Sequence, residues 1–235
     1  MTNVLKTNLS MIRHVAVHLD DLLEKVVFLG GAATALLITD MAAPDVRITN
    51  DVDIIAEIAS RRDYYRFAES LRARGFVEDS GEGTPLCRWR IKGAIVDVMP
   101  TDENILGFSN RWYSRTLLHA QTVEIPSLLM IRVATAPYFL ATKIEAFNNR
   151  GRGDLLASHD MEDIVTILDG RPEVVDEVVT SEEDVRGFIA DFFRAILGAR
   201  NFLEALPGHL YPDTASQRRI PIILERIRRI SYADK

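Results

Sequence analysis

The first half of the chain shows short apolar blocks separated by polar turns, a pattern that predicts strands and helices in mixed order. Apolar residues recur at helical spacing over residues 9–25, and a short apolar block at 26–29 predicts a buried strand. The same reasoning predicts further helices at 32–41 and 60–74, and further strands at 52–58, 76–78, 87–91, 94–99, 122–125 and 128–133. This half is therefore expected to combine a sheet with flanking helices.

Several small residues mark the ends of these elements. Gly30 and Gly31 interrupt the pattern between the strand at 26–29 and the helix that follows. Ser60 is a predicted N-cap, and Gly75 is a predicted end of the same helix. Gly93 lies between two strand patterns and predicts a hairpin.

The pattern changes after residue 135. From residue 138 onward, apolar positions follow helical periods almost to the end of the chain, while residues 104–119 give no clear pattern. We therefore predict an α+β protein with two domains. A mixed α/β domain covers residues 1–135, and an all-helical domain covers residues 136–235.

Composition is that of a folded protein without a membrane span. The 235 residues are 47% hydrophobic and 26% charged, which is typical of globular chains. No apolar run reaches the roughly 18 residues that a transmembrane helix needs, and no N-terminal leader is evident. The single cysteine, Cys87, can form neither an internal disulfide nor a cysteine-rich zinc site. A cytoplasmic protein is the expectation.

The formal charge of −6 argues against a uniformly basic surface that coats nucleic acid. Arginines nevertheless cluster in two places. These are Arg61, Arg62, Arg66, Arg72 and Arg74, and then Arg218, Arg219, Arg226, Arg228 and Arg229. Either cluster could contact a polyanion or could simply form a solvated helix face.

Three aspartates indicate chemistry. Residues two apart on a strand point to the same face, so Asp51 and Asp53 would present two carboxylates together. Asp97 lies within an apolar strand pattern, where a charge is costly to bury without a reason. Hard oxygen ligands favour Mg²⁺ or Mn²⁺, so these three aspartates are the candidate metal ligands if their strands are neighbours.

The glycine pair offers a place for phosphate. Gly30 and Gly31 would let the backbone approach an anion closely, and the helix that follows would supply free N–H groups. Thr34 could add a hydroxyl, and Arg47 could contact the outer phosphates of a nucleoside triphosphate. The order of glycine turn, carboxylate pair and third carboxylate is more specific than any part alone.

These motifs together resemble those of a known superfamily. LGG at 29–31, TNDVDI at 49–54 and VDV at 96–98 resemble the DNA polymerase β-like nucleotidyltransferases, although Gly31 stands where that superfamily usually has serine. In the helical half, LATKIEAF at 140–147, then Arg150, then SHDMEDI at 158–164 resemble the AbiE-type abortive-infection toxins within it. The resemblance covers about residues 26–171.

The resemblance implies a nucleotidyltransferase fold with a mixed sheet and flanking helices, and it implies two further site residues. Lys143 would contact the nucleotide phosphates, and Asp160 would complete the catalytic site with Asp51, Asp53 and Asp97. Asp163 competes with Asp160, because aspartates three apart on a helix share a face. Some members of the family modify the 3′ end of tRNA and are controlled by an antitoxin.

The resulting hypothesis is a Mg²⁺-dependent, toxin-like enzyme that transfers a nucleotide from an NTP to an acceptor hydroxyl, with RNA or tRNA as the expected acceptor. One alternative keeps the chemistry but uses an antibiotic-type small molecule or a protein as acceptor. Another alternative is a catalytically silent nucleotide-binding or scaffold protein with the same fold. A cognate antitoxin is a possible partner of the first.

Overall fold

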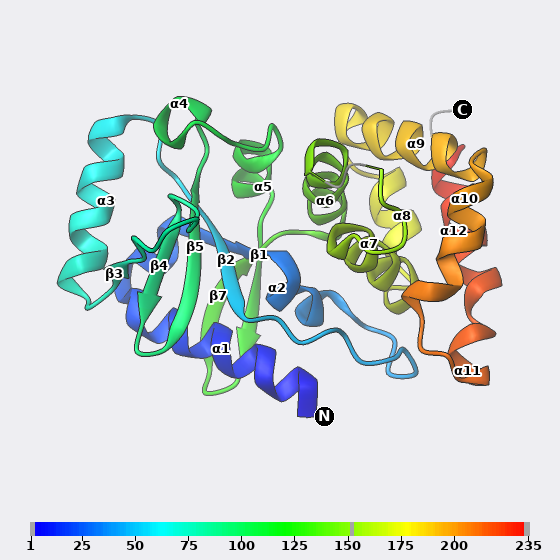
Figure 1. Ribbon diagram of the computed structural model, residues 1–235, viewed down its shortest axis with the longest axis horizontal. Helices are drawn as coiled ribbons and strands as arrows, with labels where there is room; N and C mark the ends of the chain where they lie inside the picture. Colours follow the sequence, from blue (N-terminus) through cyan, green and yellow to red (C-terminus); the bar gives the residue numbers. More distant parts are fainter. Residues whose placement is uncertain (1–2, 151–152, 233–235) are drawn as a thin grey trace. The chain divides into compact units, whose positions relative to one another are not determined.

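A computed structural model describes residues 3–150 and 153–232 of the chain (Figure 1). The described residues divide into two compact units. The first contains the residues up to Leu36 together with Val46–Thr135, and the second contains Leu37–Asp45 together with the residues from Ala136 onward.

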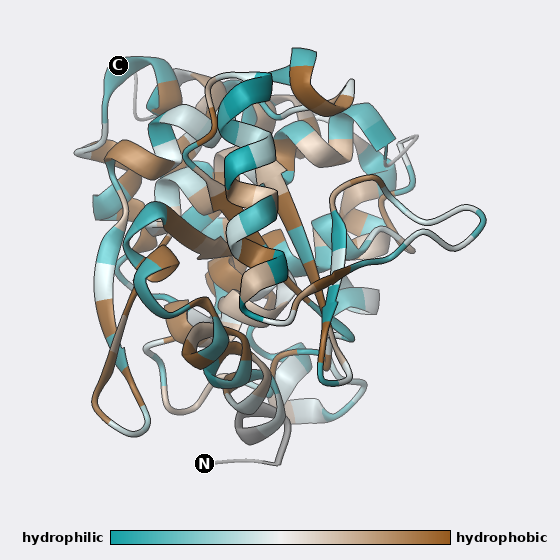
Figure 2. Ribbon diagram, turned by 90° about the vertical axis from the view of Figure 1, so that its left-hand side faces the viewer, coloured by the Kyte–Doolittle hydropathy of each residue, from teal (hydrophilic) through white to brown (hydrophobic). Residues whose placement is uncertain are grey.

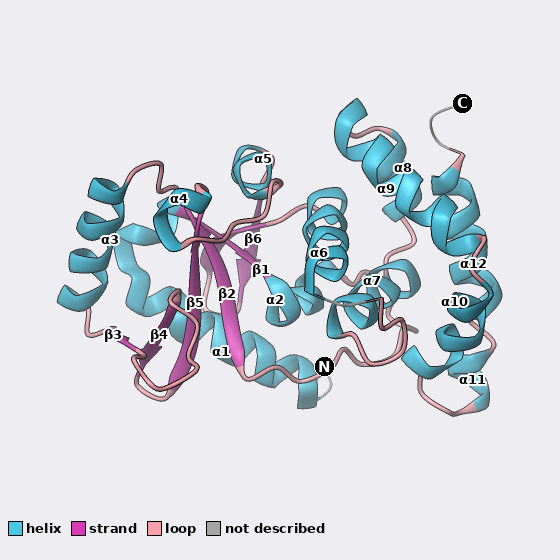
Figure 3. Cartoon of the chain, turned by 45° about the horizontal axis from the view of Figure 1, so that its top comes forward, coloured by secondary structure: helices cyan, strands magenta, loops and turns pink. Residues whose placement is uncertain are grey.

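The first unit is built around a seven-stranded mixed sheet with the strand order β3-β4-β5-β2-β1-β7-β6. Strands β2 and β5 run parallel, as do β1 and β7, and the other neighbours are antiparallel. The strands are β1 Val26–Leu29, β2 Asp51–Ala56, β3 Val77–Glu78, β4 Arg88–Ile91, β5 Ala94–Pro100, β6 Gln121–Ile125 and β7 Leu129–Val133. This sheet and its helices confirm the predicted α+β class (Figure 3).

Hydrophobic residues explain which strands are central. All four residues of β1 are buried, and β1 lies inside the sheet with β2 along one edge and β7 along the other. In β2, the half-buried Asp51 and Asp53 alternate with the buried Val52 and Ile54. Figure 2 shows brown hydrophobic segments along the strands, whereas α3 (Arg61–Ala73) carries many teal hydrophilic positions.

Helices flank this sheet. The first, α1 (Asn3–Leu19), contacts β2 and β5. Ser60 caps α3 as predicted, since its side chain accepts a hydrogen bond from the backbone N–H of Asp63. The remaining helical segments are η1 Asp20–Lys25, α2 Gly30–Leu37, α4 Glu103–Leu106 and α5 Tyr113–Leu118.

The helices differ from the prediction in three regions. The helix predicted over 9–25 becomes a 3₁₀ helix at Asp20, whose φ of 52° interrupts α-helical geometry. The helix predicted over 32–41 begins at Gly30 and ends at Leu37. The unassigned residues 104–119 contain most of α4 and all of α5, which are too short to give a clear period.

The second unit consists of helices and loops, with no strand among its described residues. Its helices are α6 Ala136–Arg150, α7 His159–Gly170, α8 Val174–Val179, α9 Glu183–Leu197, α10 Arg200–Ala205, η2 Leu206–His209, α11 Thr214–Gln217 and α12 Ile220–Ser231. Helix α6 contacts α7 and α9, and α12 contacts α7, α8 and α9.

The segment Leu37–Asp45, here called the strap, joins this helical unit although it lies far away in the sequence. The backbone N–H groups of Thr39 and Asp40 both donate to the Gly170 carbonyl at 3.0 Å. Arg219 contacts Asp40 and Asp169, each at 2.6 Å. The division predicted at residue 135 places the strap in the N-terminal half. The hydrophobic pattern of the strap gives no sign that its partners are Gly170 and Arg219.

Across the described parts of the chain, no helix combines the length and hydrophobicity that crossing a bilayer would require.

Candidate functional site

Two of the three predicted carboxylates occupy matching positions on neighbouring strands. In the parallel pair of β2 and β5, Asp53 lies at the same register as Asp97. Asp51 is two residues earlier on β2 and therefore points to the same face as Asp53. The strand of Asp97 therefore lies beside the strand of Asp51 and Asp53, which was the condition for the three aspartates to act together.

A residue that the sequence analysis did not single out binds two of these carboxylates. Arg88 on β4 lies opposite Asp97 in the antiparallel pair of β4 and β5. Its Nε and Nη2 atoms donate to the two carboxylate oxygens of Asp97 at 2.8 and 2.7 Å. Its Nη2 atom also donates to Oδ2 of Asp51 at 3.3 Å. The guanidinium therefore joins both carboxylates, and the bonds to Asp97 raise its pKa above the ordinary value.

The register of the hairpin was the signal that could have identified Arg88. Lys92 and Gly93 form a two-residue turn in which both φ angles are positive, at 44° and 92°. A turn of this length pairs Ile91 with Ala94 and, three residues back along the hairpin, Arg88 with Asp97. The residue opposite the buried aspartate could therefore have been counted from the sequence.

The two glycines allow side chains to approach the turn after β1 closely. Gly30 has a φ of 73°, and a Cβ atom at this position would collide with the carboxylate of Asp53. A Cβ atom on Gly31 would lie 2.5 Å from Nη2 of Arg47 and also 2.5 Å from Cγ2 of Thr49. The turn thus lies beside Asp53 and the Arg47 guanidinium, both named from the sequence.

Thr34 occupies a different environment. Its side chain is buried, and its hydroxyl donates to the carbonyl of Gly30 at 3.3 Å. This bond is of the kind that serine and threonine form with the preceding turn of their own helix. In this structure the Thr34 hydroxyl therefore forms a hydrogen bond within α2.

The other predicted residues form a buried charge cluster in the second unit. Lys143 of α6 lies 2.6 Å from Oδ2 of Asp163 and 3.2 Å from Oδ1 of Asp160 on α7. Arg150 donates to both carboxylate oxygens of Asp160 at 2.9 Å. Sequence reasoning left Asp160 and Asp163 as competitors, and Lys143 contacts both.

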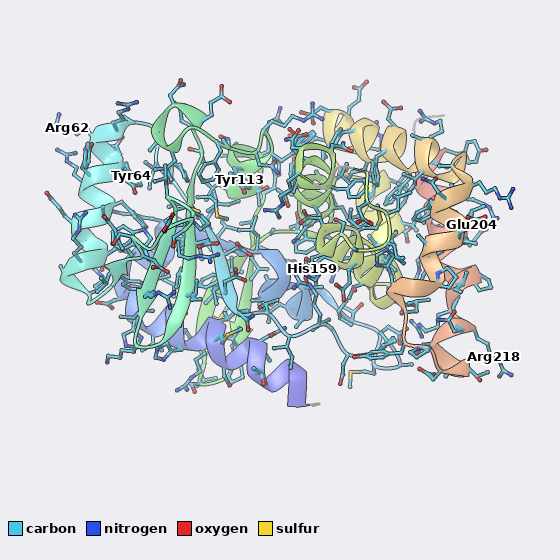
Figure 4. The ribbon with its side chains drawn as sticks, viewed as in Figure 1. Arg62, Tyr64, Tyr113, His159, Glu204 and Arg218 are labelled. Carbon is cyan, nitrogen blue, oxygen red and sulfur yellow. The ribbon has the colours of Figure 1, made fainter. Side chains whose placement is uncertain are left out.

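Burial and charge act on Asp160 in opposite directions. Burial raises its pKa, but the hydrogen bonds from Arg150 and the charge of Lys143 outweigh burial, so the pKa lies below its ordinary value. His159, which begins α7, is exposed and pairs with Glu162 at 3.1 Å (Figure 4).

Most of the C-terminal arginines have protein partners. Arg219 pairs with Asp169 and Asp40, and Arg226 donates to the Leu168 and Asp169 carbonyls at 2.6 Å. The pairs of Arg228 with Glu225 and of Arg229 with Asp176 are longer, at 3.8 and 3.3 Å. Arg218, after α11, is exposed (Figure 4). Structural roles thus account for Arg219 and Arg226.

Cys87 precedes Arg88 and is buried. Burial raises the pKa of its thiol to about 12, and the negative charge of Asp97 adds to this effect. We expect the thiol to stay unmodified by a maleimide at pH 8 in the native protein and to react within minutes in urea, because the thiolate is the reactive form. Rapid labelling of the native protein, followed by mass spectrometry, would contradict this prediction.

The three carboxylates fit a divalent cation in donor type. Across residues 3–150 and 153–232, no group of three or more His, Cys, Asp and Glu residues is arranged to hold a metal ion. Asp51 and Asp97 nevertheless bind one positive charge between them, and that charge is the Arg88 guanidinium. The oxygen ligands are thus of the type that Mg²⁺ and Mn²⁺ prefer, and the guanidinium of Arg88 contacts both oxygens of Asp97 and one of Asp51.

Comparisons with known proteins give remote similarities. No protein-family model matches the chain, and no curated protein matches it. An "antigenic nucleotidyltransferase-like protein from Paracoccidioides brasiliensis" is 19% identical, with a TM-score of 0.47 and coverage of 85% of this chain and 93% of that chain. A "putative nucleotidyltransferase from H. pylori" is 10% identical, with a TM-score of 0.49 and coverage of 98% and 96%. Neither similarity identifies the family of this chain.

Proposed function

We propose that the protein is a nucleotidyltransferase that moves a nucleoside monophosphate from an NTP to an acceptor hydroxyl. The observation that carries this proposal is the register of β2 and β5, which sets Asp53 beside Asp97 with Asp51 on the same face. The glycine turn at Gly30 meets the Asp53 carboxylate, so a phosphate held by that turn would lie close to the aspartates. A carboxylate set beside a phosphate-binding turn suits phosphoryl chemistry.

In the proposed reaction, the acceptor oxygen forms a bond to the α-phosphorus, the bond to the bridging oxygen breaks, and pyrophosphate leaves. Once Arg88 has released the Asp97 carboxylate, Asp97 takes the proton of the acceptor hydroxyl. A divalent cation held by Asp51, Asp53 and Asp97 would neutralise the charge on the phosphates. Arg47, beside Gly31, donates to the outer phosphate oxygens.

RNA, and tRNA in particular, is the proposed acceptor, in a toxin-like role. The resemblance of the motifs to AbiE-type toxins is the main reason for this choice. Arg62, labelled in Figure 4, is exposed on α3. Arg66 on the same helix is exposed as well, and both supply cationic groups of the kind that bind a phosphate backbone. The roles that the resemblance implies for Lys143 and Asp160 stay predictions.

The test uses the full chain with Mg²⁺, each of the four α-³²P-labelled NTPs in turn, and total bacterial RNA, followed by gel electrophoresis. We expect one NTP to label a tRNA-sized band, with no label from the γ-³²P form of the same NTP. Asp53→Asn should lose the label, and the exposed Asp45→Asn should keep it.

Parallel reactions with proteins and with aminoglycoside-type small molecules test the other acceptors. Label on one of these in place of RNA would keep the chemistry and replace the acceptor. A wild-type protein that labels nothing under any of these conditions would contradict the proposed activity.

One observation favours a second candidate, a nucleotide-binding protein without transferase activity. Arg88 already offsets one of the two negative charges of Asp97 and Asp51, so part of the charge that a metal would compensate is compensated by the protein itself. Equilibrium dialysis with a labelled NTP, combined with the absence of pyrophosphate release, would support this candidate.

A further inference from the structure

Arg88 lies at the same carboxylate site, so a regulatory role for this residue rests on the proposed function. Arg88 uses two nitrogen atoms on the two oxygens of Asp97 and one of these nitrogens again on Asp51. A bidentate arginine–carboxylate pair of this kind is among the stronger polar contacts in proteins. The contact therefore engages both oxygen atoms of Asp97.

A metal ion and the guanidinium cannot share these oxygens freely. Both are cations, so they repel each other at the distances that a common carboxylate imposes. A divalent ion on Asp97 would also draw electron density from the oxygens that accept the hydrogen bonds of Arg88 and would weaken those bonds. Binding of the metal and retention of the Arg88 contact are thus in competition.

The fold lets Arg88 leave without disturbing the sheet. Cys87 and Trp89, its neighbours in the chain, are both buried, and β4 is paired with β5 from Arg88 to Ile91. The backbone of Arg88 is therefore fixed. Its side chain is 24% exposed and has several rotatable bonds, so the guanidinium can turn away from Asp97 toward solvent while the strand stays in place.

We propose that Arg88 is an internal counter-ion that competes with the divalent cation for Asp97 and Asp51. Arg88 stabilises the sheet while no metal is bound, and it must release Asp97 before the site can be loaded. The protein consequently folds without metal, and it binds the free metal ion weakly because each binding event breaks the Arg88 contacts.

Mn²⁺ binding measured by electron paramagnetic resonance tests this proposal on the full chain. Arg88→Gln removes the competing charge, so we expect the Mn²⁺ dissociation constant to fall about tenfold or more. Arg90→Gln is the matched control, because Arg90 lies two residues further along the same strand, on the same face, and pairs with Asp79. This control should bind Mn²⁺ as the parent does.

The melting temperature gives a second test that does not require the Mn²⁺ dissociation constant. Removal of Arg88 leaves two carboxylates without their cation, so the melting temperature of Arg88→Gln in EDTA should fall and should recover when Mn²⁺ is added. The parent and Arg90→Gln should change little between EDTA and Mn²⁺. Arg88→Lys keeps the charge, loses the bidentate geometry, and should bind Mn²⁺ with intermediate affinity.

Equal or weaker Mn²⁺ binding by both Arg88 variants would overturn the proposal, as would an absence of binding in all proteins. Circular dichroism tests whether each variant is folded. If Arg88→Gln does not fold, the Mn²⁺ dissociation constant of Arg88→Lys relative to the parent decides the question. Tighter binding by Arg88→Gln without nucleotide transfer by the parent would support the role of Arg88 and contradict the proposed function. Nucleotide transfer by the parent, combined with unchanged Mn²⁺ affinity in the Arg88 variants, would support the proposed function and contradict the role of Arg88.

Discussion

The substitution Asp53→Asn is expected to reduce nucleotidyl transfer by a factor on the order of 10³, as losses of single groups that stabilise transition-state charge do. Asp53 is the central carboxylate of the set, because it lies at the register of Asp97 and beside the turn at Gly30. Asparagine has nearly the same volume and keeps one oxygen atom. The substitution therefore removes the charge without creating a cavity.

The measurement is the initial rate of label transfer from the α-³²P NTP that the parent uses. Asp45→Asn, an exposed aspartate at the end of the strap, controls for the change of aspartate to asparagine. Both variants should give the circular dichroism spectrum of the parent. Their melting temperatures should lie within a few degrees of the parental value. A variant at position 53 that is folded and retains the parental rate would exclude Asp53 from the chemistry.

The substitution Lys143→Met is expected to lower the free energy of unfolding by about 3–5 kcal/mol, the range found when one partner of a buried ion pair is removed. Lys143 is 8% exposed and Asp163 only 1%, so little water reaches their contact. Methionine fills most of the volume of lysine. The loss would leave the buried carboxylates of Asp160 and Asp163 without the Lys143 charge, while Arg150 still pairs with Asp160.

Urea denaturation followed by circular dichroism measures this loss. Lys25→Met is the control, because Lys25 is exposed at the end of the 3₁₀ helix before β1 and should change the stability by less than about 0.5 kcal/mol. A loss below about 1 kcal/mol for Lys143→Met would show that desolvation nearly cancels the attraction within the cluster.

Periodicity predicted most strands of the sheet and the face on which the candidate carboxylates lie. The alternation through β2 correctly placed Asp51 and Asp53 on one face, and the strand that carries Asp97 meets the condition that it lies beside β2. Arg88 was missed because an arginine on a predicted strand is ordinary by type, and only its register opposite Asp97 makes it significant. Local pattern thus identified the carboxylates, and pairing identified their partner.

Contacts between distant residues were beyond the reach of such patterns. Sequence spacing put Asp160 and Asp163 on one helix face, but it could not show that Lys143 contacts both of them. The arginine cluster near the C-terminus suggested a polyanion, whereas Arg219 and Arg226 bind groups of α7 and the strap. A count of charges cannot tell a solvated arginine from one that a buried aspartate holds.

The strap makes the helical unit discontinuous in the gene. Residues 37–45 are encoded between the glycine turn and the carboxylate strand, yet the backbone N–H groups of Thr39 and Asp40 donate to Gly170. A single recombination event at codon 135 would therefore separate the helices from the nine residues that bind them. Exchange of this unit between related genes would need to carry both pieces together, so the two halves of this protein are expected to be inherited as one block.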